Sequence, residues 1–193
     1  MNTDVQPGEI NVFWGEIAPC DHFIQIYESD SVFLDSLEGF VGGGIRSGDA
    51  VIVIATPTNL KALENRLWAQ GLDLSTARSQ DQYIALDAEE MLSKFMINSW
   101  PDDELFRQVV TEIITRARGN DRQVRAFGEM VAVLWARSDH AATVRLEHLW
   151  HNLCRTEAFS LFCAYPKSGF TADAAASMSE LCAAHSKVIG GIA

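Results

Sequence analysis

The stretch AVIVIA at residues 50–55 is apolar at every position, and TPTNLK at residues 56–61 follows it directly. An uninterrupted apolar run of this length is typical of a central strand in a parallel sheet, because helices cover both faces of such a sheet. Beyond residue 58, leucines recur at helical spacing, so the strand leads into a helix. This strand–turn–helix unit predicts an α/β fold.

The turn after this strand indicates which class of α/β protein is present. A nucleotide-hydrolysing P-loop protein carries G-x-x-x-x-G-K-[ST] there, so that backbone N–H groups wrap the phosphates and the lysine reaches the terminal phosphate. Residues 56–59 contain no glycine. The stretch GGIRSGD at residues 43–49 has similar glycine spacing, but it precedes the strand and places Asp49 where the lysine would be. We therefore expect a binding or sensing protein rather than an enzyme, with no catalytic residues.

Strands and helices alternate along the rest of the chain, which predicts a three-layer fold with a mainly parallel central sheet and helices on both faces. The predicted strands are residues 22–27, 50–55, 83–86, 124–127 and 158–165. The last three predicted helices are residues 130–135, 141–155 and 172–188.

Helix boundaries follow from capping residues and from glycine and proline. Thr58 is predicted to cap the helix after the central strand, with the apolar face including Trp68, and Asp87 is predicted to cap the next helix. Pro101 fits the first turn of the following long helix. The glycines at 42–44 are expected to weaken the first helix, which Gly48 ends.

Composition excludes several classes of function. The chain has 193 residues, 48% of them apolar, and a net charge of −11. So acidic a protein is not expected to bind nucleic acid or an anionic membrane, both of which require basic surfaces. Its four cysteines form no C-x-x-C pair, the amino terminus has no signal-peptide pattern, and no apolar run is long enough to span a membrane. These features predict a cytoplasmic protein with reduced thiols.

Polar side chains are predicted to gather where strands end. Ligands of open parallel sheets bind beyond the carboxyl ends of the strands, and Tyr27, Thr56 and Glu129 each fall at such an end. Glu129 lies between two apolar segments, so we expect it to be partly buried. A structural salt bridge to Arg125 and a contact with a ligand both account for such a carboxylate.

The segment RLEHLWH at residues 145–151 is a candidate metal site. Glu147 and His151 share a helix face, and His148 lies on an adjacent turn, so the three could ligate a metal. The order differs from the H-E-x-x-H pattern, and a solvated polar face is the favoured interpretation. Cys163, inside an apolar strand, is expected to pack in the core rather than to act as a nucleophile. We therefore predict no metal, and no cofactor can be named.

Four segments in this order resemble a known family: GDAVIVIAT at 48–56, RAFGEMV at 125–131, LEHLWH at 146–151 and LFCAYP at 161–166. They are similar to the MEDS domain, the sensory domain named for methanogens, methylotrophs and a dichloromethane-responsive regulator. The resemblance implies a RecA/KaiC-like fold without a Walker A loop. It assigns residues 1–20 to an amino-terminal leader and residues 21–193 to the sensory domain. Such domains occur beside histidine-kinase, response-regulator and DNA-binding modules. Because no such module is expected in this chain, the resemblance implies that it acts on a partner in trans or is a piece of a larger protein.

Three functions remain open from the sequence. The first is a non-enzymatic sensor of a small-molecule effector, for which the predicted contact residues are Tyr27, Thr56, Glu129, Trp135 and His22. The second is a divergent ATPase, with Lys61 replacing the missing loop lysine and Glu129 acting as catalytic base or magnesium contact. The third is a pure interaction scaffold, such as a homodimer, anchored by exposed tryptophans. The missing glycines favour the first.

Overall fold

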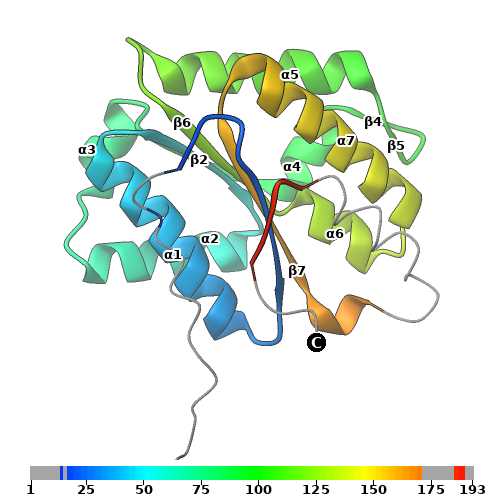
Figure 1. Ribbon diagram of the computed structural model, residues 1–193, viewed down its shortest axis with the longest axis horizontal. Coiled ribbons are helices and arrows are strands. Elements are labelled where there is room, and N and C mark those ends of the chain that lie inside the picture. Colours follow the sequence, from blue (N-terminus) through cyan, green and yellow to red (C-terminus); the bar gives the residue numbers. More distant parts are fainter. Residues whose placement is uncertain (1–13, 15–16, 171–184, 190–193) are drawn as a thin grey trace, which may run out of the picture.

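The computed structural model describes residues 14, 17–170 and 185–189, and a parallel sheet forms its centre (Figure 1). In the described residues this sheet has six strands in the order β3-β2-β6-β7-β1-β8, and every neighbouring pair runs parallel. The predicted three-layer α/β fold is therefore confirmed. The strands are β1 (His22–Tyr27), β2 (Ala50–Ala55), β3 (Tyr83–Asp87), β6 (Val124–Gly128), β7 (Ser160–Pro166) and β8 (Lys187–Ile189).

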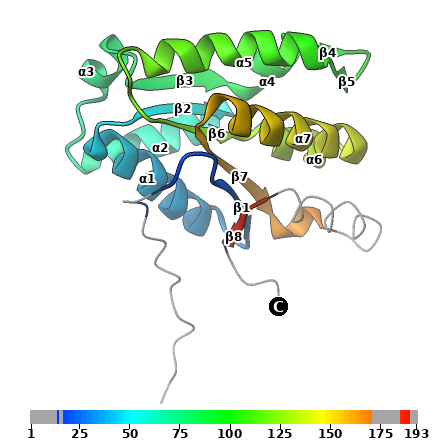
Figure 2. The same ribbon diagram turned by 45° about the horizontal axis from the view of Figure 1, so that its top comes forward.

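Helices cover both faces of the sheet, as Figure 2 shows. One face carries α1 (Asp30–Ser47), α2 (Pro57–Ala69) and α3 (Leu74–Ser79). The other carries α4 (Ala88–Ser93), α5 (Asp103–Arg118), α6 (Met130–Ala136) and α7 (His140–Glu157). A short hairpin of β4 (Met96–Ile97) and β5 (Trp100–Pro101) precedes α5, and a 3-10 turn at Lys167–Gly169 follows β7. No helix in the described part of the chain is both long and apolar enough to cross a bilayer.

Strand β2 shows why the apolar run predicted a central strand. Every residue of β2 is buried. Val51 and Val53 belong to the core beneath α1–α3, whereas Ile52 and Ile54 belong to the core beneath α4–α7. Successive side chains of a strand point to opposite faces, so a strand covered on both faces must be apolar at every position.

The glycines of α1 allow close packing and do not end the helix. The helix continues through residues 42–44 and stops at Gly48, whose φ of 84° is left-handed. A Cβ atom on Gly44 would lie 2.7 Å from Cγ2 of Val51 and 3.0 Å from Cδ of Arg125. Glycine at this position therefore lets α1 approach the sheet.

Two predicted helix starts are wrong. Helix α2 begins at Pro57 with Thr56 as the N-cap residue, so Thr58 lies inside the first turn, because proline is favoured at the first helical position. Pro101 lies in β5, and Asp102 caps α5 by accepting a hydrogen bond from the N–H of Leu105.

Two further differences concern Trp68 and the carboxyl-terminal segment. Trp68 was predicted on the apolar face of α2, but 77% of its surface is exposed. Of the predicted helix at 172–188, residues 172–184 lie outside the described residues. Lys187–Ile189 form β8, which pairs with β1. A strand therefore replaces the end of the predicted helix.

Candidate functional site

Strands β2 and β6 are neighbours in the sheet, and the chain continues from their carboxyl ends to helices on opposite faces. Helix α2, on one face, follows β2, whereas α6 and α7, on the other, follow β6. Such a switch in direction is where open α/β sheets bind ligands. Thr56 is the first residue after β2, and Glu129 is the first after β6. The N–H of Glu129 donates to the carbonyl of Ile54 at 2.8 Å, which fixes Glu129 beside the end of β2.

The Glu129 carboxylate accepts hydrogen bonds from the start of α2. The N–H of Thr56 donates to Oε2 at 2.7 Å, and Nδ2 of Asn59 donates to Oε1 at 2.7 Å. The hydroxyl of Thr56 lies 3.2 Å from Oε2 and 3.3 Å from Oε1. A helix amino terminus attracts anions, and a P-loop protein holds phosphate at this position. Here the carboxylate of Glu129 accepts the hydrogen bonds from the start of α2.

Burial controls the protonation of the groups at this end of the sheet. Burial raises the pKa of Glu129, although its hydrogen bonds with Thr56 and Asn59 oppose that shift. Burial, followed by the nearby charge of Glu129, raises the pKa of Tyr27 to about 12. Tyr27 is therefore a neutral phenol, and its ring stacks on Phe33 with the ring centroids 4.8 Å apart. The structure brings Tyr27, Thr56 and Glu129 to the same end of the sheet.

Arg125 does not pair with Glu129. Its Nε donates to Oδ2 of Asp49 at 2.7 Å, and its Nη1 donates to the carbonyl of Trp14 at 2.7 Å. Arg125 lies near the amino end of β6, beside Val51 of β2, whereas Glu129 follows the carboxyl end of the same strand. The salt bridge considered for Arg125 and Glu129 is thus replaced by one between Arg125 and Asp49.

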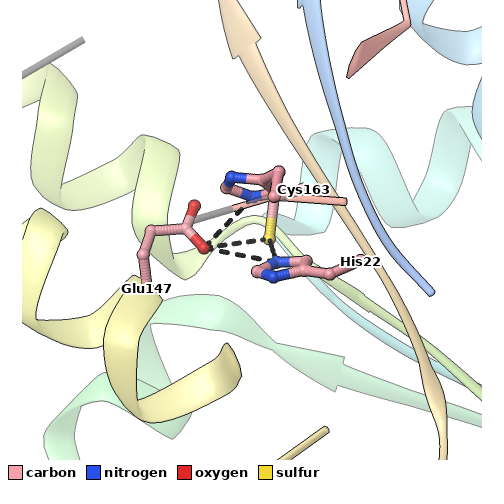
Figure 3. Close-up of side chains that lie close together, drawn as sticks. His22, Glu147 and Cys163 are labelled. Carbon is pink, nitrogen blue, oxygen red and sulfur yellow. Dashed lines mark hydrogen bonds and ion pairs between the residues drawn. The ribbon is translucent and has the colours of Figure 1, made fainter. Parts of the chain in front are cut away.

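A second group of polar side chains is enclosed beneath α7. Four side chains meet there: His22 from β1, Glu147 from α7, Cys163 from β7, and His185, which precedes β8. Figure 3 labels His22, Glu147 and Cys163. One ligand atom of each residue lies within 4.8 Å of the others, and the side chains of His22 and Glu147 are 1% and 0% exposed. We call these four residues the buried His–Glu–Cys–His cluster.

Glu147 is the centre of this cluster. Its Oε2 lies 3.4 Å from Nε2 of His22, 3.4 Å from Nε2 of His185 and 3.6 Å from Sγ of Cys163. Its Oε1 accepts a hydrogen bond from the hydroxyl of Tyr165. The predicted solvated polar face of α7 is therefore wrong at Glu147, because this position faces β7 and β1 rather than water.

Burial and mutual contact set the pKa values in the cluster. Burial lowers the pKa of His22 and raises that of Cys163 well above its ordinary value. Burial alone would raise the pKa of Glu147, but contact with His185 and His22 holds it below the usual range. A neutral imidazole beside a carboxylate is a donor set that binds transition metals.

The family model for MEDS, the methanogen/methylotroph, DcmR sensory domain, matches residues 21–186. The chain belongs to the MEDS family. A search of curated proteins finds no match. The chain is thus a member of a family of sensory domains.

In this MEDS domain, the other two predicted contact residues lie apart from the Thr56–Glu129 contact. Trp135 is a buried residue of α6 whose Nε1 donates to the carbonyl of Gly169 at 2.8 Å, and its ring contacts His140. His22 begins β1, at the opposite end of that strand from Tyr27, and belongs to the buried cluster.

The sequence interpretation missed two site residues, Asn59 and His185. Asn59 had a usable signal, because it is an amide in the first turn of a helix that follows a strand. His185 had none, because its predicted helical setting gave it no neighbours. Only the pairing of β8 with β1 brings it beside His22, with the ring centroids 3.8 Å apart.

Proposed function

We propose that this MEDS domain is a non-enzymatic sensor. It binds a small organic effector at the carboxyl ends of β2 and β6 and signals to a histidine kinase, response regulator or transcription regulator in trans. The observation that carries the proposal is the hydrogen bonding of Glu129 to Thr56 and Asn59 at the start of α2. This arrangement keeps the ligand-binding position of the fold but gives it the charge opposite to that required for phosphate.

The same contact argues against a divergent ATPase. A nucleotide phosphate would compete with the Glu129 carboxylate for the N–H of Thr56 and would then lie against a negative charge. The lysine that could compensate, Lys61, is exposed on α2. An ATPase would need this carboxylate to move away before phosphate could bind.

The residues around Glu129 define the chemistry of the effector. The carboxylate can accept hydrogen bonds from a neutral or cationic donor, and the neighbouring Tyr27 offers an aromatic ring and a neutral hydroxyl. An effector with a donor group and a small apolar body suits this environment. It would compete with Thr56 and Asn59 for Glu129 and so favour a different position of α2.

Helix α2 also provides a route for the signal to the surface. Its first turn contacts Glu129, and Trp68 near its carboxyl end is exposed beside a surface cavity of about 560 Å³ between α2 and α3. A partner that contacts Trp68 would detect a shift of α2. Under this proposal, α2 takes part in both effector binding and output.

A thermal-shift screen with alcohols, amines, amides and small halocarbons tests the proposal. We expect at least one compound to raise the Tm of the wild type, with the shift lost in Glu129→Gln and retained in Glu112→Gln, an exposed position on α5. A broad panel that never moves the Tm contradicts effector binding. ATP hydrolysis by the purified chain that is lost in Lys61→Ala would contradict the assignment as a non-enzyme.

A further inference from the structure

We propose that His22, Glu147, Cys163 and His185 bind a divalent transition-metal ion of the zinc class, with all four ligands supplied by the chain. Two imidazoles, a thiolate and a carboxylate are the side chains that bind Zn²⁺ in proteins. Alkaline-earth ions prefer sets made wholly of oxygen, so the cluster does not suit Ca²⁺ or Mg²⁺.

The separations between the donor atoms match the edges of a tetrahedral site. Zinc bonds of about 2.0–2.3 Å at tetrahedral angles place neighbouring ligand atoms about 3.3–3.7 Å apart. Oε2 of Glu147 lies 3.4 Å from Nε2 of His22 and 3.4 Å from Nε2 of His185. Sγ of Cys163 lies 3.6 Å from Oε2 of Glu147 and 3.6 Å from Nε2 of His22. Four of the six edges therefore have the required length, and all six are below 4.8 Å.

The two imidazole nitrogens lie farther from the Glu147 carboxylate than in a short hydrogen bond. A good N–H···O hydrogen bond measures about 2.7–3.2 Å, and charge-assisted ones are shorter. Both imidazole nitrogens lie 3.4 Å from the same carboxylate oxygen. The two imidazole contacts are therefore longer than a good N–H···O hydrogen bond, whereas the Cys163 thiol, at 3.6 Å, makes only a weak hydrogen bond to the same oxygen.

The surroundings of the cluster indicate a structural or regulatory ion rather than a catalytic one. Four protein ligands leave no open position at a tetrahedral metal, and open positions mark catalytic zinc. The Tyr165 hydroxyl donates to the other oxygen of Glu147, which is the outer-shell support that orients a ligating carboxylate. The ion would join β1, α7 and β7 to the segment that precedes β8.

This metal site goes beyond effector sensing and is separate from it. Its ligands lie beneath α7, whereas the proposed effector site is formed by Tyr27, Thr56 and Glu129 at the strand ends. The two proposals can therefore fail independently. Loss of metal binding leaves the Glu129-dependent thermal shift as a separate measurement.

Metal content and cobalt spectroscopy test the site directly. The full chain is purified without a histidine tag, under reducing conditions, and zinc is measured by mass spectrometry after dialysis. We expect about one zinc ion per chain. Titration of the metal-free protein with Co²⁺ should give intense visible bands of tetrahedral Co²⁺ and a thiolate-to-cobalt charge-transfer band in the near-ultraviolet.

Matched variants locate the ion. Cys163→Ser should abolish the charge-transfer band, and His185→Gln should reduce zinc affinity about 10-fold or more. Cys154→Ser, at a buried cysteine outside the cluster, and His148→Gln, on α7 but outside the cluster, should bind as the wild type does. The proposal is overturned if the wild type binds neither Zn²⁺ nor Co²⁺. It is also overturned if Co²⁺ binds to the wild type without a thiolate band, because Cys163 would then not be a ligand. Both of these measurements use the wild type, so they do not depend on whether the variants fold.

Discussion

At the scale of single residues, Glu129 determines the character of the strand-end site. A carboxylate buried after a central strand needs donors, and the first turn of α2 supplies them through Thr56 and Asn59. The helix amino terminus thereby receives a negative charge from within the protein. The start of α2 therefore binds an internal carboxylate, whereas P-loop proteins bind phosphate at a helix amino terminus.

Glu129 should make stability depend on pH. Burial raises its pKa in the folded state above the ordinary 4.5, so the folded protein keeps a proton that the unfolded chain loses. This contribution is complete below pH 4.5 and is lost as the pH rises through the folded pKa. As the pH rises from 4.5 through the folded pKa, the free energy of unfolding measured in urea should decline less in Glu129→Gln than in the wild type. An unchanged decline in Glu129→Gln, with Glu112→Gln as the control, would refute the assignment.

The buried pair of Arg125 and Asp49 should be necessary for stability. Arg125 is 3% exposed, and Asp49→Ala would remove its carboxylate partner and leave its charge beside the carbonyl of Trp14 and the ring of Phe40. We expect the free energy of unfolding to fall by about 3 kcal/mol. Combining Asp49→Ala with Arg125→Met should recover part of that loss, because no unpaired charge remains. A loss below about 1 kcal/mol in urea unfolding would contradict this role.

At the scale of elements, the packing of α1 against β2 depends on the absence of a side chain at Gly44. Replacing a glycine in a helix interior with alanine normally stabilises it by about 1 kcal/mol. Gly44→Ala should instead destabilise the protein by about 1–3 kcal/mol, because its Cβ would lie 2.7 Å from Val51. Denaturant unfolding measures this difference.

Gly43→Ala provides the matched control for Gly44→Ala. A Cβ atom there would lie 3.5 Å from the nearest atoms of Trp14, which is ordinary van der Waals contact. We expect this variant to be neutral or stabilised by up to about 1 kcal/mol. If both variants lost stability equally, strain common to both positions would be responsible, and the close approach to β2 would not.

At the scale of the whole molecule, the two proposed sites occupy different parts of one sheet. The proposed effector site lies at the carboxyl ends of β2 and β6, and the proposed metal site lies between α7 and the strands β7 and β1. A chain of contacts runs between the two regions. Trp135 of α6, the helix that follows Glu129, packs edge-on against Tyr165 with the ring centroids 6.0 Å apart, and Tyr165 donates to Glu147.

Metal binding should stabilise one side of the sheet more than the other. Strand β8 is an edge strand that pairs with β1 over three residues, and only Ser186 separates His185 from it. Addition of Zn²⁺ should slow amide hydrogen exchange in β1 and β8, with little change in β3 at the opposite edge. At a hundredfold excess of free Zn²⁺ over Kd, the Tm should rise by about 5–10 °C. Equal protection of all strands would show that zinc acts elsewhere.

The sequence predicted local structure well wherever short-range patterns dominate. The apolar run at 50–55 indicated a strand covered on both faces, and Gly48 marked the end of α1. The start of α2 was misplaced because Thr56 and Thr58 are both capping residue types, and only the position of Pro57 distinguishes them. Trp68 was misplaced because spacing along a helix identifies a face but does not show whether another element covers it.

The sequence by itself determined the strand–turn–helix order, the absence of a phosphate loop and the placement of Tyr27, Thr56 and Glu129 at strand ends, because these follow from residues close together in the chain. Only the tertiary structure decided which side chains meet. The order of strands brings β1 between β7 and β8, and so places His22, Cys163 and His185 together beneath Glu147. Contacts across more than a hundred residues depend on this order, which local patterns do not encode.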